Sequence, residues 1–103
     1  MAERRRPVRQ RRRLRVALGK VAVFTADVSD GGFCAELMHV LEPGHPVSGT
    51  LSLGPHEYPF TGKVAWARGG EPRLGQRGRM GVRFDHVDDH FLAAYHATFP
   101  SAH

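Results

Sequence analysis

The chain has 103 residues, 41% of them hydrophobic, which is enough for one modest core and excludes a multidomain enzyme. Its net charge of +5 is unevenly placed, because residues 1–15 hold eight arginines and one acid, whereas residues 16–103 hold seven Lys or Arg and nine acids. The first segment therefore carries +7 and the rest −2, so an anionic partner must be met chiefly by the first segment.

Residues 1–15 are predicted to form a flexible basic arm. They show no apolar periodicity, include Pro7, and are too highly charged to bury a face. Lys20 interrupts the apolar stretch behind the arginines, so a signal peptide is not expected, and Cys34 has no second cysteine with which to pair. No run approaches the roughly 18 apolar residues of a membrane span. We expect a cytoplasmic protein with no membrane partner.

Residues 16–103 are predicted to form one domain built mainly of short strands. Apolar and polar residues alternate through most of this region, and Gly and Pro pairs such as Pro43-Gly44 and Gly54-Pro55 mark the turns. The predicted strands are 16–18, 21–24 leading into Asp27, 33–37, 47–53, 58–66 and 80–84.

The end of the chain changes to a helical period. Phe91, Tyr95 and Phe99 recur at a spacing of four, Asp88 or Asp89 is placed to cap the start, and Pro100 to end the helix. The expected fold class is all-β, a small antiparallel barrel with one C-terminal helix laid against it.

Two motifs carry the chemistry. The segment 10–16 contains RxxxR, in which Arg11 and Arg15 are the chosen pair because Val16 begins the strand, although Arg5 with Arg9 and Arg9 with Arg13 have the same spacing. The segment 27–33 contains DxSxxG, formed by Asp27, Ser29 and Gly32.

Together with residues 62–66 and 80–84, these motifs resemble the PilZ family, and the resemblance extends from Arg11 to the final helix. It implies a six-stranded β-barrel that binds the bacterial second messenger cyclic di-GMP, with the paired arginines on the arm and the DxSxxG turn on the barrel. It also implies a receptor that acts through a downstream protein partner. Only 11 residues separate Arg15 from Asp27, fewer than is usual in the family, so the first hairpin is expected to be short.

The chemistry of these residues agrees with such a ligand. A guanidinium can fork onto a phosphate, pair with guanine O6 and N7, or stack on a purine, and Arg11 and Arg15 are assigned these roles with Arg12 and Arg13 as auxiliaries. The Asp27 carboxylate can accept from the guanine N1–H and N2–H groups, and the Ser29 hydroxyl can add a bond. Gly32, which has no Cβ, would let the backbone approach the ligand or take a positive φ, and Gly31 is counted with it among the ligand-binding residues.

Singly, each of these residues also suits an ordinary turn or a solvated tail, so the prediction depends on their combination. Two other functions remain open: a PilZ-fold interaction module that binds no nucleotide, and a basic-arm nucleic-acid binder. The acidic body disfavours the second, because a general nucleic-acid surface extends its charge beyond one tail.

Catalysis and metal binding are not expected. The chain has no GxSxG or Walker motif and no base assigned to Cys34, so no catalytic residue is predicted. His86 and His90 with neighbouring acids do not complete a zinc site, and no cofactor is predicted. Trp66 shares the alternation of Val64 and is predicted to pack in the core.

Overall fold

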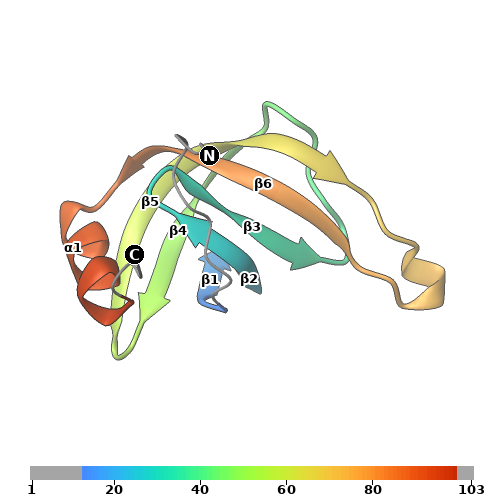
Figure 1. Ribbon diagram of the computed structural model, residues 1–103. Coiled ribbons are helices and arrows are strands. Elements are labelled where there is room, and N and C mark those ends of the chain that lie inside the picture. The colour runs from blue at the N-terminus through green and yellow to red at the C-terminus, as the bar shows by residue number, and fades with distance from the viewer. Residues whose placement is uncertain (1–12, 100–103) are drawn as a thin grey trace, which may run out of the picture.

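Six antiparallel strands close into a barrel in the order β1-β2-β3-β6-β5-β4, and one helix follows the last strand (Figure 1). The computed structural model describes residues 13–99, so most of the predicted basic arm lies outside the described residues. The predicted all-β barrel with a C-terminal helix is confirmed. The elements are β1 Arg15–Leu18, β2 Val21–Ser29, β3 Gly32–Leu37, β4 Pro46–Leu53, β5 His56–Arg68, the 3₁₀ turn η1 Pro72–Leu74, β6 Gly78–Val87 and α1 Asp89–Thr98.

The barrel interior is filled by the apolar residues that alternate along the strands. Phe33 of β3 meets Phe60 of β5 edge to face, with ring centroids 5.5 Å apart. Fully buried residues come from all six strands, and the largest of them are Phe33, Leu51, Met80, Val16, Val28 and Val64. Because the next side chain along each strand points outward, this interior set also fixes which residues reach the outer face.

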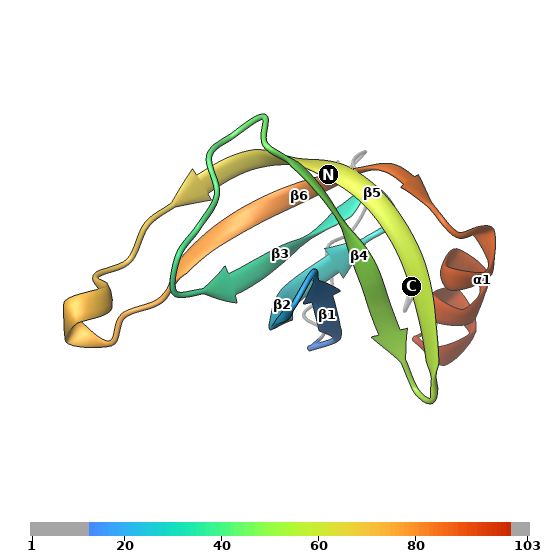
Figure 2. The same ribbon diagram turned by 180° about the vertical axis from the view of Figure 1, so that it is seen from behind.

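Helix α1 covers one end of the barrel (Figures 1 and 2). Its N-cap is Asp88, whose carboxylate accepts a hydrogen bond of 2.7 Å from the His90 backbone N–H. That bond lowers the pKa of Asp88 below its usual value near 3.8. Phe91 is fully buried and its ring lies 5.7 Å from that of Tyr58 in β5. The helix is therefore held to the barrel by aromatic packing.

The first hairpin is short, as its spacing predicts. Strand β1 has four residues, and Gly19, with φ of +62°, makes the turn into β2. The ladder between β2 and β3 begins at the pair Phe24 and Glu36, so Val21–Val23 lie beyond its end, where β2 is paired with β1. The two strands diverge towards this end of the barrel.

The connection between β5 and β6 projects from the end of the barrel opposite α1 and carries η1 at its tip (Figures 1 and 2). Leu74, at this tip, is 73% exposed. None of the helices in the described part of the chain is long and apolar enough to cross a membrane.

Candidate functional site

A register shift in β2 turns Asp27 to the outside of the barrel. Thr25 and Val28 are both buried inside, although strict alternation would place residues three apart on opposite faces. The shift resolves this conflict, because Ala26 has no partner in the ladder to β3 and Asp27 pairs with Cys34. Asp27 consequently faces outward, half-buried, beside the end of the hairpin.

A second shift, in β5, also turns Trp66 to the outside of the barrel. Val64 pairs with Val82 and lies inside, whereas Trp66 pairs with the adjacent Gly81 and is 38% exposed. Ala65 is the extra residue of this bulge. The prediction that Trp66 packs in the core is therefore wrong. The physical reason is the bulge at Ala65, which places Val64 and Trp66 on opposite faces of β5 although they are two residues apart.

Asp27 and Trp66 stand at the two ends of one cross-strand row. The pairings run from Asp27 to Cys34, from Cys34 to Gly81, and from Gly81 to Trp66, across β2, β3, β6 and β5. Cys34 is buried but does not belong to the core cluster that contains Phe33. A Cβ at Gly81 would lie 2.1 Å from Trp66 Nε1, so the indole lies closely against this glycine. The row thus has a carboxylate at one end and, at the other, an aromatic ring that covers Gly81.

Cations border this row on both sides. On one side, the next outward-facing row contains Arg83 of β6 paired with Lys63 of β5. On the other side, the next outward-facing row contains Arg79 of β6 paired with Arg68 of β5. Lys63 pairs with Asp85 at 2.7 Å, and Arg79 pairs with Glu36 at 2.7 Å.

Within residues 13–99, Arg83 and Arg68 have no ion pair, so no acidic side chain in this range neutralises their positive charge. We call the outward side chains of β2, β3, β6 and β5 the outer face.

In the turn between β2 and β3, the positive φ predicted as one option for Gly32 is wrong. Gly32 does not take a positive φ, and a Cβ at this position would lie 1.9 Å from the backbone oxygen of Val82. Its missing side chain therefore admits strand β6. Gly31 has open space around a Cβ, and its carbonyl accepts from Phe84 N–H at 2.8 Å. The Ser29 hydroxyl is directed to the Gly32 carbonyl at 3.5 Å, a weak bond that a ligand could replace.

Helix α1 contacts this turn directly. His96 Nε2 lies 2.7 Å from Asp30 Oδ1, and both side chains are about half exposed. The tip of the DxSxxG hairpin is thereby tied to the C-terminal helix. Asp27 is the half-buried carboxylate of the motif and Asp30 the exposed one.

The start of the described chain is fastened alongside β2. Leu14 is buried, its N–H donates to Thr25 Oγ1 at 2.8 Å, and its carbonyl accepts from Thr25 N–H at 2.9 Å. Arg13 and Arg15 on either side of it are exposed, with Arg15 opposite Phe24. The structure therefore brings Arg15 to the strand that carries Asp27 and Ser29.

Arg11 and Arg12 lie outside the described residues, so their predicted contacts stay predictions. Lys63, Arg68 and Arg83 were missed by sequence reasoning, since alternating strand residues carry no signal of which outward cations will be neighbours. Over residues 13–99, no group of three or more His, Cys, Asp or Glu could hold a metal ion.

Comparison with protein-family models identifies the family of this chain. A family model described as the PilZ domain matches residues 2–96. The chain belongs to the PilZ domain family. PilZ domains are receptors for cyclic di-GMP and not enzymes as a family. A search of curated proteins finds no match.

One solved structure with a similar fold is that of Bacillus subtilis Inhibitor of motility (MotI/DgrA). The TM-score is 0.73 at 17% sequence identity, and the match covers 90% of this PilZ domain and 47% of that chain. At this identity the likeness shows the fold alone. The present chain spans about half the length of that protein.

Proposed function

We propose that this PilZ domain is a receptor for cyclic di-GMP, which binds on the outer face between the basic arm and the DxSxxG turn. The observation that supports this most strongly is the pair of bulges, because they turn both Asp27 and Trp66 to the outside of the barrel and into one cross-strand row. Bulges that re-aim side chains are common beside functional sites. In a barrel without a binding site at this position, a tryptophan would be expected inside, where its burial stabilises the fold.

The two ends of the row suit two parts of a guanine, its hydrogen-bonding edge and its ring face. The Asp27 carboxylate is an acceptor that matches the N1–H and N2–H donors of the base edge. The exposed indole of Trp66 offers a surface on which a purine can stack, and stacking of this kind contributes about 1–3 kcal/mol per base. The lack of a side chain at Gly81 lets the indole lie against the barrel surface next to Cys34.

The cations suit the two phosphates. Arg83 and Arg68 flank the row, and Arg15 begins β1 beside β2. Guanidinium groups bind phosphate in a forked geometry that lysine cannot reproduce. In this proposal Arg11 and Arg15 hold the ligand from the arm with help from Arg12, while Ser29, Gly31 and Gly32 line the turn. Because cyclic di-GMP is an intracellular signal, the domain would act in the cytoplasm and pass the signal to a protein partner.

A calorimetric titration tests this proposal. We expect saturable binding of cyclic di-GMP, and much weaker binding of GTP, because a linear nucleotide with one base cannot engage the arm and the turn together. Duplex DNA serves as a polyanion control at raised salt, which screens attraction to an exposed basic tail. Equal affinity for GTP or DNA would support the nucleic-acid alternative. No binding of any nucleotide would support the interaction module.

A further inference from the structure

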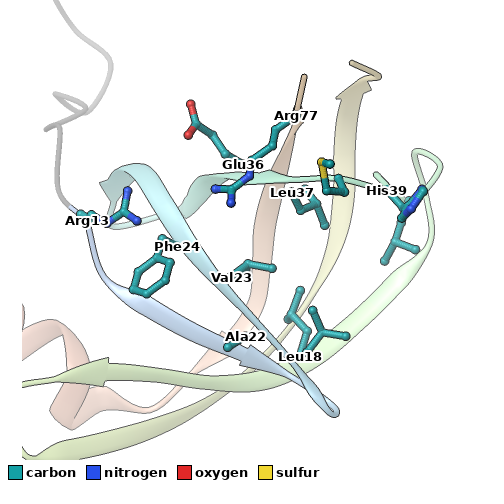
Figure 3. Close-up of a pocket in the computed structure, with 12 residues that line it drawn as sticks. Arg13, Leu18, Ala22, Val23, Phe24, Glu36, Leu37, His39 and Arg77 are labelled. Carbon is teal, nitrogen blue, oxygen red and sulfur yellow. The ribbon is translucent and has the colours of Figure 1, made fainter. Parts of the chain in front are cut away.

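A hollow of about 530 Å³ lies at the end of the barrel where β2 and β3 diverge (Figure 3). Its apolar wall comes from the β1–β2 hairpin, from the end of β3 and from the segment that follows it. The main residues of this wall are Leu18, Val21, Ala22, Val23, Leu37 and Met38. The volume lies within the range of roughly 300–1,000 Å³ that is typical of small-molecule sites.

The early end of the β2–β3 ladder explains why the hollow exists. If the β2–β3 ladder continued past its last pair, Phe24 and Glu36, Val23 would face Leu37 and close this space. Instead the strands separate, and apolar side chains that would otherwise meet line an opening. Val21 is 58% exposed and Met38 39% exposed, which is an unfavourable position for such residues in water.

The mouth of the hollow is basic. Arg13 and Arg77 both line it, from opposite sides, and Arg13 lies over the ring of Phe24 at 4.3 Å from its centroid (Figure 3). Glu36 is also at the mouth, but its carboxylate accepts two bonds from Arg79, of 2.7 and 3.1 Å. Within residues 13–99, Arg77 has no ion pair or hydrogen-bond partner through its side chain. Two guanidinium groups therefore face a mouth at which the one carboxylate is already neutralised.

The geometry points to a second binding site, specific for a small amphipathic anion. Its apolar chain fills the hollow, and its carboxylate or phosphate head lies between Arg13 and Arg77. Burial of an alkyl chain contributes about 0.8 kcal/mol per methylene, and the guanidinium groups supply the charge-assisted bonds that select an anionic head.

This site differs from the nucleotide site proposed above, with which it shares only Arg13, an auxiliary arginine of the arm. The hollow is not lined by Arg15, Asp27, Ser29, Gly31 or Gly32. Its polar side chains are Arg13, Glu36, His39 and Arg77, and the Glu36 carboxylate already accepts from Arg79, so a guanine placed against the apolar wall would leave its N–H donors unpaired. Its existence does not depend on cyclic di-GMP binding.

The methionines give a direct reporter. Met38 lines the hollow, whereas Met80 is fully buried in the barrel interior. In the full chain labelled with ¹³C-methyl methionine, titration with sodium decanoate below its micelle-forming concentration should shift the Met38 methyl signal in a saturable way and leave Met80 unchanged. Decyltrimethylammonium, which has the same chain and the opposite charge, should produce no saturable shift.

Matched variants identify the head-group contact. Arg77→Ala should weaken decanoate binding by about tenfold, since a bond between charged groups is lost. Arg73→Ala, at an arginine side chain that is 90% exposed and outside the hollow, should leave the affinity unchanged. Ala22→Trp should fill the hollow and abolish binding, while Ala65→Trp on exposed β5 should not.

Several results would overturn this proposal. They are a Met38 signal that does not respond to decanoate, equal shifts at Met38 and Met80, equal binding of the cationic amphiphile, or equal effects of the two arginine variants. Vesicles containing phosphatidylglycerol separate a free ligand from a lipid surface. Binding to the vesicles with no response to free decanoate would also contradict a small-molecule site.

Discussion

The two ends of strand β2 differ in pairing and in chemistry. From Phe24 to Ser29 the strand is paired on the β3 side, and one bulge within that stretch turns a carboxylate outward. From Val21 to Val23 it lies beyond the β2–β3 ladder, and apolar residues line a hollow. One strand can therefore offer a polar surface at one end and an apolar cavity at the other. The difference arises from register, since both ends have strand backbone.

The largest effect is expected from a substitution at the paired end of β2, where Gly32 of β3 lies opposite Ser29. Gly32→Ala would place a Cβ 1.9 Å from the Val82 carbonyl oxygen, which is backbone and cannot move aside cheaply. We expect a loss of about 2–3 kcal/mol in the free energy of unfolding, measured by urea denaturation. Gly31→Ala is the matched control, because it meets nothing within 4 Å and its φ is not positive. Equal losses in the two variants would show that β3 and β6 are not packed as described.

This pair of glycines also shows which features of the fold the sequence can predict. The alternation of apolar residues predicted the strands, and their period of four predicted the helix, because both patterns follow from burial of one face. It could not show that Gly32 makes room for β6, because that contact joins residues 50 apart in the chain. Nor could it show the direction of Trp66, since nothing in residues 64–66 marks Ala65 as a bulge. The hollow was equally hidden, because it follows from where the β2–β3 ladder begins.

Trp66→Ala sharpens the distinction between an outer-face residue and a core residue. On the outer face, its loss should cost about 1–3 kcal/mol in the free energy of cyclic di-GMP binding. It should change the free energy of unfolding much less than the 3–5 kcal/mol expected of a buried tryptophan. Trp66→Phe should retain part of the binding. Titration and denaturation of the same samples measure both quantities, and a large loss of stability with intact binding would reverse the assignment.

The smallest expected effect concerns the N-cap of α1, the helix that contacts the turn through His96 and Asp30. The pKa of Asp88 is lowered in the folded state, chiefly by the His90 N–H bond. Its contribution is therefore present above its usual pKa near 3.8 and is lost as the pH falls through the lowered value. Asp88→Asn should keep the cap but remove this part of the pH dependence of Tm below about pH 4. An unchanged pH dependence would contradict the assigned cap.

The most direct test of the nucleotide site is the sign of the effect of Asp27→Ala on cyclic di-GMP affinity. If a basic arm simply attracts an anion, removing a negative charge should leave binding unchanged or strengthen it. If Asp27 accepts from guanine, the variant should lose about 1–3 kcal/mol of binding free energy despite its greater positive charge. Glu57→Ala, an exposed acid at the other end of β5, makes the same charge change away from the row and should not weaken binding. With folding verified by circular dichroism, our account predicts a clear loss for Asp27→Ala alone, and parent-like affinity in that variant would contradict it.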